Sequence, residues 1–385
     1  MNIEEVGVKR ARIQVTDSCV AAGDVTPTAD SLFHTFPSLT RCSDGAFLCA
    51  TLVGSEKSGP DGRIRLFRSA DGCRNWSPVP SPTAADEAEN PGWGYLVCHI
   101  AETEPGRLLA AYLRADRFDA AQPLFHPQTS GMQRTVVRLC DSEDNGRSWS
   151  APRDLDYRLP DLIVPGRFVH LPDGALGMPF EVWHEWDNGW REGPSTRLAR
   201  SSDLGRSWPE AGLIARDADR ALIYGDPRVT ELADGRLVAL LWAYNIKTEK
   251  DLPVHRAESA DSGRTWSGVQ ETGLAAQITS PVSLRRGLML AVYQKRFGAD
   301  AGLRALLSYD EGKSWDVQTD VPLWEMGHHT DANNPFSGYQ EYAFGYSLVL
   351  RLGPEEAMVS FWVSNGKTTY VRLIRVTVEG QNDVE

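Results

Sequence analysis

The sequence of 385 residues has no apolar run of the roughly 18 residues that a membrane-spanning helix needs. Residues 1–15 alternate charged and apolar side chains and lack the apolar stretch of a secretory signal, so we expect a cytoplasmic protein that does not bind membranes. A basic cluster is also missing. The net charge is −12 and the arginines are dispersed among carboxylates, which argues against nucleic acid as a partner.

The six cysteines lack the CxxC spacing that is typical of zinc sites, and the sequence predicts neither a metal ion nor another cofactor. All six lie within the first 140 residues, and most of them fall in apolar segments with the character of strands. The simplest interpretation is a set of buried free thiols in a reducing compartment.

What the sequence does contain is an internal repeat. The pattern Ser-x-Asp-x-Gly-x-Ser/Thr-Trp recurs five times, and Cys73 replaces the glycine in the first copy. The aspartate can accept hydrogen bonds from its own turn, the glycine permits positive φ, and the tryptophan can bury its ring beside the neighbouring repeat. The copies span Ser69–Trp76, Ser142–Trp149, Ser201–Trp208, Ser259–Trp266 and Ser308–Trp315.

A hairpin of two apolar strands precedes each copy, and several of these hairpins turn at Asp-Gly. We expect their first strands to include Phe36–Leu39, Phe168–Leu171 and Val229–Leu232. Six such units predict an all-β, six-bladed propeller with four antiparallel strands per blade, formed by residues 1–385 as one domain. The last blade lacks an outer strand, which the N-terminal segment around Lys9–Val15 can supply and so close the ring.

These Asp-box repeats, also called BNR repeats, resemble those of the sialidase (neuraminidase) superfamily over nearly the whole chain. The resemblance implies a glycosidase that acts on carbohydrate. Tyr346, within Gly345–Leu348, matches the family's tyrosine nucleophile, and Asp226 stands where the family has the acidic partner of that tyrosine. Asp61, in a loop of the first blade, matches the acid/base aspartate. The departure is Thr35, which replaces the leading arginine of the family's carboxylate clamp.

The order of strands in a blade brings the starts of the first strands and the ends of the second strands to one mouth of the ring. Carboxylates, arginines and aromatic side chains gather at these positions, a mixture that suits a sugar. His328, His329 and Asp331, before the last blade, are a second group, either for substrate contact or for a metal. The candidate substrate-binding residues are Trp93, Arg167, Glu181, His184, Arg228, Arg296 and Glu341.

The sequence therefore favours a retaining glycoside hydrolase of the sialidase-like type, in which Tyr346 attacks, Asp226 assists and Asp61 protonates the leaving group. An acid/base pair in the third blade, around Glu181, is an alternative within this mechanism. Three other functions stay open, namely a true exo-α-sialidase with a rebuilt clamp, a uronate-sugar lyase, and a non-catalytic carbohydrate-binding propeller. Neither the sugar nor the oligomeric state follows from the sequence.

Overall fold

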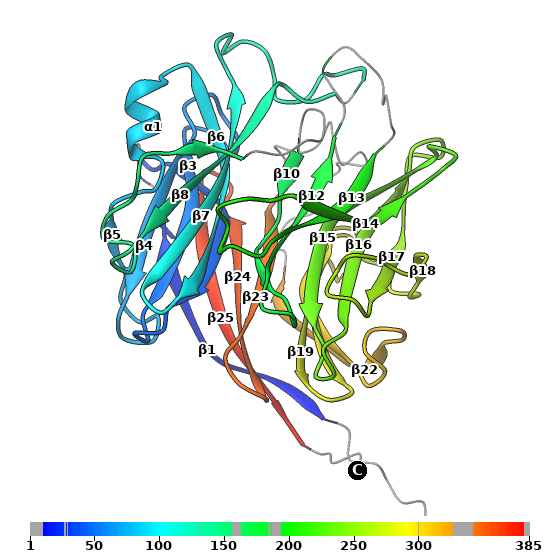
Figure 1. The fold of residues 1–385 in the computed structure, drawn as a ribbon. Coiled ribbons are helices and arrows are strands. Elements are labelled where there is room, and N and C mark those ends of the chain that lie inside the picture. Colours follow the sequence, from blue (N-terminus) through cyan, green and yellow to red (C-terminus); the bar gives the residue numbers. More distant parts are fainter. Residues whose placement is uncertain are drawn as a thin grey trace, which may run out of the picture.

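The computed structural model describes residues 11–380 except positions 27, 29, 130, 156–162, 184–185, 187–193, 299 and 326–341. The described strands form six antiparallel sheets, the blades of a propeller, and in the first five the strands follow one another in sequence (Figure 1). The first three blades comprise β2 (Phe33–Arg41), β3 (Phe47–Gly54), β4 (Arg63–Ser69) and β5 (Ser77–Val79); β6 (Trp93–Glu104), β7 (Arg107–Asp116), β8 (Thr135–Ser142) and β9 (Arg153–Asp154); and β10 (Ile163–Pro165), β11 (Val169–His170), β12 (Leu176–Val182), β13 (Ser195–Ser201) and β14 (Glu210–Arg216).

The last three blades repeat the same order, and the six-bladed fold predicted from the sequence is confirmed. They comprise β15 (Leu222–Glu231), β16 (Leu237–Asn245), β17 (Lys250–Ser259) and β18 (Gln270–Glu271); β19 (Thr279–Arg285), β20 (Leu288–Lys295), β21 (Gly302–Ser308) and β22 (Asp316–Glu325); and β23 (Phe344–Arg351), β24 (Glu356–Ser364), β25 (Thr369–Glu379) and β1 (Arg12–Ala22).

The ring closes in the sixth blade, where β1 pairs antiparallel with β25 from Arg12 opposite Glu379 onward. In Figure 1 these two strands, blue and red, run side by side. Closure by the N-terminal strand is as predicted, but the strand extends to Ala22, well beyond the predicted end at Val15. The end of the strand could not be predicted from the sequence, because β1 is an outer strand that exposes most of its side chains and so lacks apolar alternation.

The innermost position of blade 3 corrects the predicted strand at Phe168–Leu171. Two short strands, β10 and β11, both pair with β12 there. Between them the chain leaves the ladder at Gly166, whose N–H donates to the carbonyl of Pro179 at 2.7 Å. The strand is divided because Pro165 and Gly166 follow each other, and neither residue supports a continuous ladder.

The five Asp boxes form the turns predicted from their residues. Each aspartate accepts a hydrogen bond from the backbone N–H four residues later, at 2.8–3.0 Å. Each leading serine hydroxyl accepts one from the N–H at the glycine position. Cys73 has φ +76°, close to the +81° to +87° of the equivalent glycines, so the turn keeps its shape despite the substitution.

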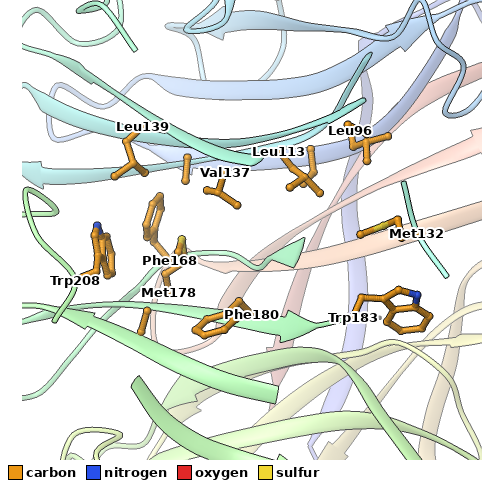
Figure 2. Packing of buried hydrophobic residues seen from close by; sticks show 14 of the residues in the cluster. Leu96, Leu113, Met132, Val137, Leu139, Phe168, Met178, Phe180, Trp183 and Trp208 are labelled. Carbon is orange, nitrogen blue, oxygen red and sulfur yellow. The ribbon is translucent and has the colours of Figure 1, made fainter. Parts of the chain in front are cut away.

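The cores lie between neighbouring blades, and the core between blades 2 and 3 has the greatest bearing on the site. Figure 2 shows Leu113, Val137 and Leu139 on one side facing Phe168, Met178 and Phe180 on the other. Trp208, from the Asp box of blade 3, is 3% exposed and stacks on Phe168 at 6.1 Å between ring centroids. At its other end the cluster reaches Leu96, Met132 and Trp183, which give one mouth of the ring an apolar wall.

The link between blades 1 and 2 carries α1 (Ala84–Glu89), which the sequence did not predict. Its Asp86 is fully buried and accepts hydrogen bonds from Arg114 at 2.6 Å, Arg138 at 2.9 Å and the Tyr112 hydroxyl at 3.0 Å. These three donors, together with the side-chain amide of Asn90 at 2.8 Å, satisfy the buried charge and tie the link to blade 2. All six cysteines are free thiols, and five of them are buried.

Replacing Trp208 by alanine tests the anchoring role of the Asp-box tryptophan. We expect Trp208→Ala to lower the free energy of unfolding by about 3–5 kcal/mol, because it opens a cavity against Phe168. The measurement is urea-induced unfolding. Val317→Ala is the control, since Val317 is 71% exposed and its truncation should change stability by less than about 0.5 kcal/mol. Equal stability of the two variants would contradict the anchoring role.

Candidate active site

A pocket of about 220 Å³ lies where the innermost strands begin and the second strands end, which is the mouth expected from the sequence. All six blades contribute to it. The volume is below the roughly 300–1,000 Å³ of sites for drug-sized ligands, so it suits one ring-sized group. Its lining residues are Phe36, Leu96, Val97, Leu113, Leu124, Phe125, Met132, Val164, Glu181, Trp183, Asp226, Trp242, Gln277, Ile278, Arg296, Tyr342, Gly345, Tyr346 and Trp362.

Three of the innermost strands carry the same bulge at the pocket. At each bulge two residues face a single residue of the neighbouring strand, as at Asp226 and Pro227 between the pairs Gly225–Trp242 and Arg228–Leu240. The first bulged residue is Phe36, Asp226 or Tyr346, and its φ is +49°, +49° or +51°. Bulges redirect side chains, and left-handed conformations of residues other than glycine are costly and cluster at functional sites. Here the bulges turn all three side chains into the pocket.

Two carboxylates meet in the pocket. Glu181, near the end of β12, accepts a hydrogen bond at its Oε1 from the backbone N–H of Asp226 at 2.7 Å. Burial and the nearby charge of Asp226 raise the pKa of Glu181 to about 8. Arg228 donates through Nη2 to Oδ1 of Asp226 at 3.2 Å, so Asp226 has a cationic partner that Glu181 lacks among the described residues. The raised pKa of Glu181 makes it the member of the pair that can carry a proton at neutral pH.

Tyr346 lies beneath this pair, at the floor of the pocket. Its hydroxyl shares a hydrogen bond of 2.9 Å with Nε2 of His99, and Nδ1 of His99 lies 3.0 Å from the Ser38 hydroxyl. His99 is fully buried, and burial together with the charges of Arg228 and Arg167 lowers its pKa to about 3. Burial also raises the pKa of Tyr346 well above its ordinary value, so both groups are neutral at pH 7.

The other polar side chains of the pocket are held by neighbours. Asp251 accepts from Nε1 of Trp242 at 2.7 Å and from Nε2 of Gln277 at 2.6 Å. Arg296 donates to the carbonyl of Phe344 at 2.9 Å and its guanidinium lies 3.7 Å from the ring centroid of Tyr342. These contacts fix the orientation of the groups before any ligand enters, which reduces the cost of binding.

The structure brings together five of the predicted site residues. Glu181, Asp226, Arg296 and Tyr346 line the pocket, and Arg228 packs under Tyr346 with its guanidinium 5.1 Å from the ring centroid. Thr35, at the position of the absent clamp arginine, is fully buried and donates to the carbonyl of Lys57 at 2.9 Å.

Three other predicted residues lie outside the pocket lining. Asp61 is exposed and accepts from the backbone N–H of Ser55 at 2.9 Å, so it stabilises its own turn. Trp93 packs against Arg114, whose guanidinium lies 4.4 Å from the ring centroid of Trp93. Arg167 lines a second, deeper cavity. The predicted residues His184 and Glu341, and the group of His328, His329 and Asp331, lie outside the described residues.

Sequence reasoning missed His99 and Asp251. His99 stands within the apolar segment Tyr95–Ala101, and a lone polar side chain inside such a strand was the available signal. Asp251 gave no signal, because its role depends on two partners in different strands or loops. Within the described ranges, no three His, Cys, Asp or Glu side chains gather as metal ligands. No helix in those ranges is long and apolar enough to cross a bilayer.

Comparison with known families decides the classification, because residues 121–349, more than half of the chain, match the BNR repeat-like domain. The chain belongs to this family. A curated relative of this BNR repeat-like chain is a sialidase from Bacteroides fragilis, 23% identical over 216 residues. The match covers 53% of the chain but only 37% of that sialidase.

Solved structures show the same fold at low sequence identity. A Dyadobacter fermentans protein of unknown function has a TM-score of 0.71 and 17% identity, covering 95% of this chain and 99% of that one. The Hadza microbial sialidase Hz136 has a TM-score of 0.62 and 15% identity, and the match covers 89% of this chain and 65% of that one. A Penicillium chrysogenum α-L-arabinanase complexed with arabinobiose has a TM-score of 0.61 and 15% identity, and the match covers 94% of this chain and 98% of that one. The BNR repeat-like propeller is thus structurally similar to sialidases.

The raised pKa of Glu181 makes stability depend on pH in a defined direction. The folded protein holds a proton on Glu181 up to about pH 8, whereas an unfolded chain releases it near pH 4.5. Stability therefore falls as the pH rises from about 4.5 to about 8. Glu181→Gln removes this titration. As the pH rises across this window, the melting temperature of the variant should therefore increase relative to that of the parent. Calorimetry at several pH values measures this difference.

Glu271→Gln is the matched control, since Glu271 is exposed on the two-residue strand β18. Its melting temperature should differ from that of the parent by a constant amount over the same range. A constant difference for Glu181→Gln as well would mean that Glu181 titrates at its ordinary pKa.

Proposed function

We propose that this protein is a glycoside hydrolase that removes a terminal sugar, with Glu181 as the general acid and Asp226 as the anionic partner. The observation that carries the proposal is the contact between Glu181 and the Asp226 bulge inside an aromatic pocket. A glycosidase needs one carboxyl group that carries a proton and one that does not. The similarity of the fold to sialidases and to an arabinanase supports the same reaction class.

The pocket offers separate surfaces for the two sides of a sugar ring. Aromatic side chains such as Trp183, Trp242 and Trp362 can cover the apolar face of the ring, while Gln277 and Arg296 can bind hydroxyl groups. A volume of about 220 Å³ fits a single residue at the end of a glycan rather than a stretch of its interior. The absence of arginine at Thr35 favours a sugar without a carboxylate.

The proposed reaction begins when Glu181 gives its proton to the leaving-group oxygen. Asp226 then attacks the anomeric carbon through Oδ2, since Arg228 occupies Oδ1. Water releases the sugar in a second step, with Glu181 now acting as the base, so the configuration is retained. Tyr346 is the rival nucleophile that the resemblance to sialidases implies. Its hydroxyl is directed to the buried His99 and its pKa is raised, which makes the phenolate costly.

A uronate-sugar lyase is the second candidate, and the contact between Tyr346 and His99 is the observation that favours it. A neutral histidine next to a tyrosine hydroxyl is a suitable pair for taking up and giving a proton. A lyase product contains a conjugated double bond and absorbs in the near ultraviolet, whereas a hydrolysis product does not. Absorbance during turnover of uronide substrates therefore separates the two reactions.

Leaving-group dependence tests the assignment of Glu181. The substrates are a panel of aryl glycosides, including neutral sugars, sialosides and uronides, each with a poor and a good leaving group. We expect Glu181→Gln to lower kcat by about 10²–10⁴-fold with poor leaving groups, which need protonation, and much less with dinitrophenyl glycosides, which do not. Parent activity should also fall as the pH rises through about 8. A uniform loss across all leaving groups would assign Glu181 another role.

The nucleophile is decided by a pair of variants on the best substrate from that panel. Asp226→Asn should abolish turnover with both leaving groups, because no carboxylate remains to attack. Tyr346→Phe should lower kcat by less than about tenfold, because the ring still packs on Phe36 and Arg228. Trapping of the sugar on Asp226, detected by mass spectrometry of a slow fluorinated substrate, would support the assignment. The reverse order of effects would assign the attack to Tyr346.

A further inference from the structure

A second cavity, of about 20 Å³, lies below the pocket among the inner strands and loops of blades 3 to 6. This volume holds a single water-sized species, for which about 10–15 Å³ is enough. Two arginines from different blades reach it, Arg167 from the loop before β11 and Arg228 from β15. The rest of the lining consists of Pro227, Val229, Ser280, Pro281, Leu348 and Val349. We call it the Arg167–Arg228 cavity.

Arg167 brings a charge into this cavity without a carboxylate to neutralise it. Its guanidinium donates to the carbonyl of Val349, and among the described residues it forms no ion pair. Burial lowers its pKa to about 10, which still leaves it fully protonated at neutral pH. Arg167 is half-buried, and a largely desolvated guanidinium whose hydrogen-bond partner is a neutral carbonyl favours a counter-charge nearby.

Arg228 does not remove this imbalance. It is 6% exposed, its Nη2 pairs with Asp226, and its Nε is buried without a hydrogen-bond partner. The pKa of Glu181 is raised and that of His99 is lowered, which reduces the charge that either group brings to the region. Arg167 therefore keeps no carboxylate partner among the described residues, and Arg228 keeps an unpaired Nε–H.

We propose that the Arg167–Arg228 cavity binds one small monovalent anion of the size of chloride. An anion supplies the missing negative charge, which a water molecule cannot do. A volume of about 20 Å³ favours a single-atom anion over sulfate, phosphate and carboxylate ligands, and the lining residues differ from those of the sugar pocket above it. The inference rests on charge and geometry alone and stands whether or not the protein is a glycosidase.

The bound anion has a consequence for the pocket, because Arg228 belongs to both sites. Its guanidinium lies under the ring of Tyr346 and pairs with Asp226. An anion below it offsets part of its charge and holds its position from the side opposite to Asp226. Loss of the anion leaves this arginine less firmly placed beneath the two carboxylates.

Bromide is the probe for the site, since its anomalous scattering identifies it in a crystal of the unmodified protein. We expect an anomalous peak in the Arg167–Arg228 cavity after crystals are grown in sodium bromide instead of sodium chloride. Bromide peaks at the protein surface and none in the cavity would overturn the proposal. This measurement needs no variant, so it decides the question even where a substitution prevents folding.

Thermal unfolding at constant ionic strength measures binding in solution. Replacing sodium gluconate, whose anion is too large for the cavity, by sodium chloride or bromide should raise the melting temperature by about 2–4 °C at saturation, because the anion binds only the folded protein. Arg167→Gln should abolish the difference between the salts. Arg351→Gln should keep it, since Arg351 also donates to a carbonyl, that of Leu284, but lies exposed outside the cavity. Equal melting temperatures in the two salts for the parent would contradict the site.

Discussion

The bulges of the innermost strands determine what the pocket contains. A regular strand at the centre of a propeller alternates its side chains between two neighbouring blades, and few of them would point along the axis. At Phe36, Asp226 and Tyr346 the extra residue and the left-handed backbone break this alternation. The same device thus delivers an aromatic wall, a carboxylate and a phenol to one place from blades that are far apart in sequence.

The bulge at Asp226 also sets the electrostatics of the pocket. It directs the backbone N–H of Asp226 at Glu181, and burial together with the nearby charge of Asp226 raises the pKa of Glu181. Arg228 forms an ion pair with Asp226. Burial, together with the charges of Arg228 and Arg167, keeps His99 neutral, so the floor under Tyr346 is an uncharged chain of hydrogen bonds from Ser38.

Much of the fold followed from the sequence because its signals are local. The serine, aspartate, glycine and tryptophan of each Asp box act within eight residues, so five turns and the blade order could be predicted. Blade 3 was harder, since Pro165 and Gly166 divide a strand that apolar content alone suggests is continuous. The end of β1 was missed because an outer strand that is largely exposed has no apolar pattern.

The site was predicted less completely because its chemistry depends on contacts between blades. Position in the blade was enough to bring Asp226, Tyr346 and Glu181 to one mouth. The same reasoning put Asp61 there, whereas the structure shows it bonded to Ser55 within its own turn. The proton on Glu181 could not be foreseen, because it arises from burial and from Asp226, 45 residues away along the chain.

Pairing of β1 with β25 has a consequence for biosynthesis. Arg12 lies opposite Glu379, so the sixth sheet cannot be completed until β25 has left the ribosome. Until then β1, which precedes every other strand of the ring, lacks its partner β25, and its unpaired edge is open to pairing with other chains. Contacts of such long range form slowly, so we expect closure of the ring to be a late and slow step of folding.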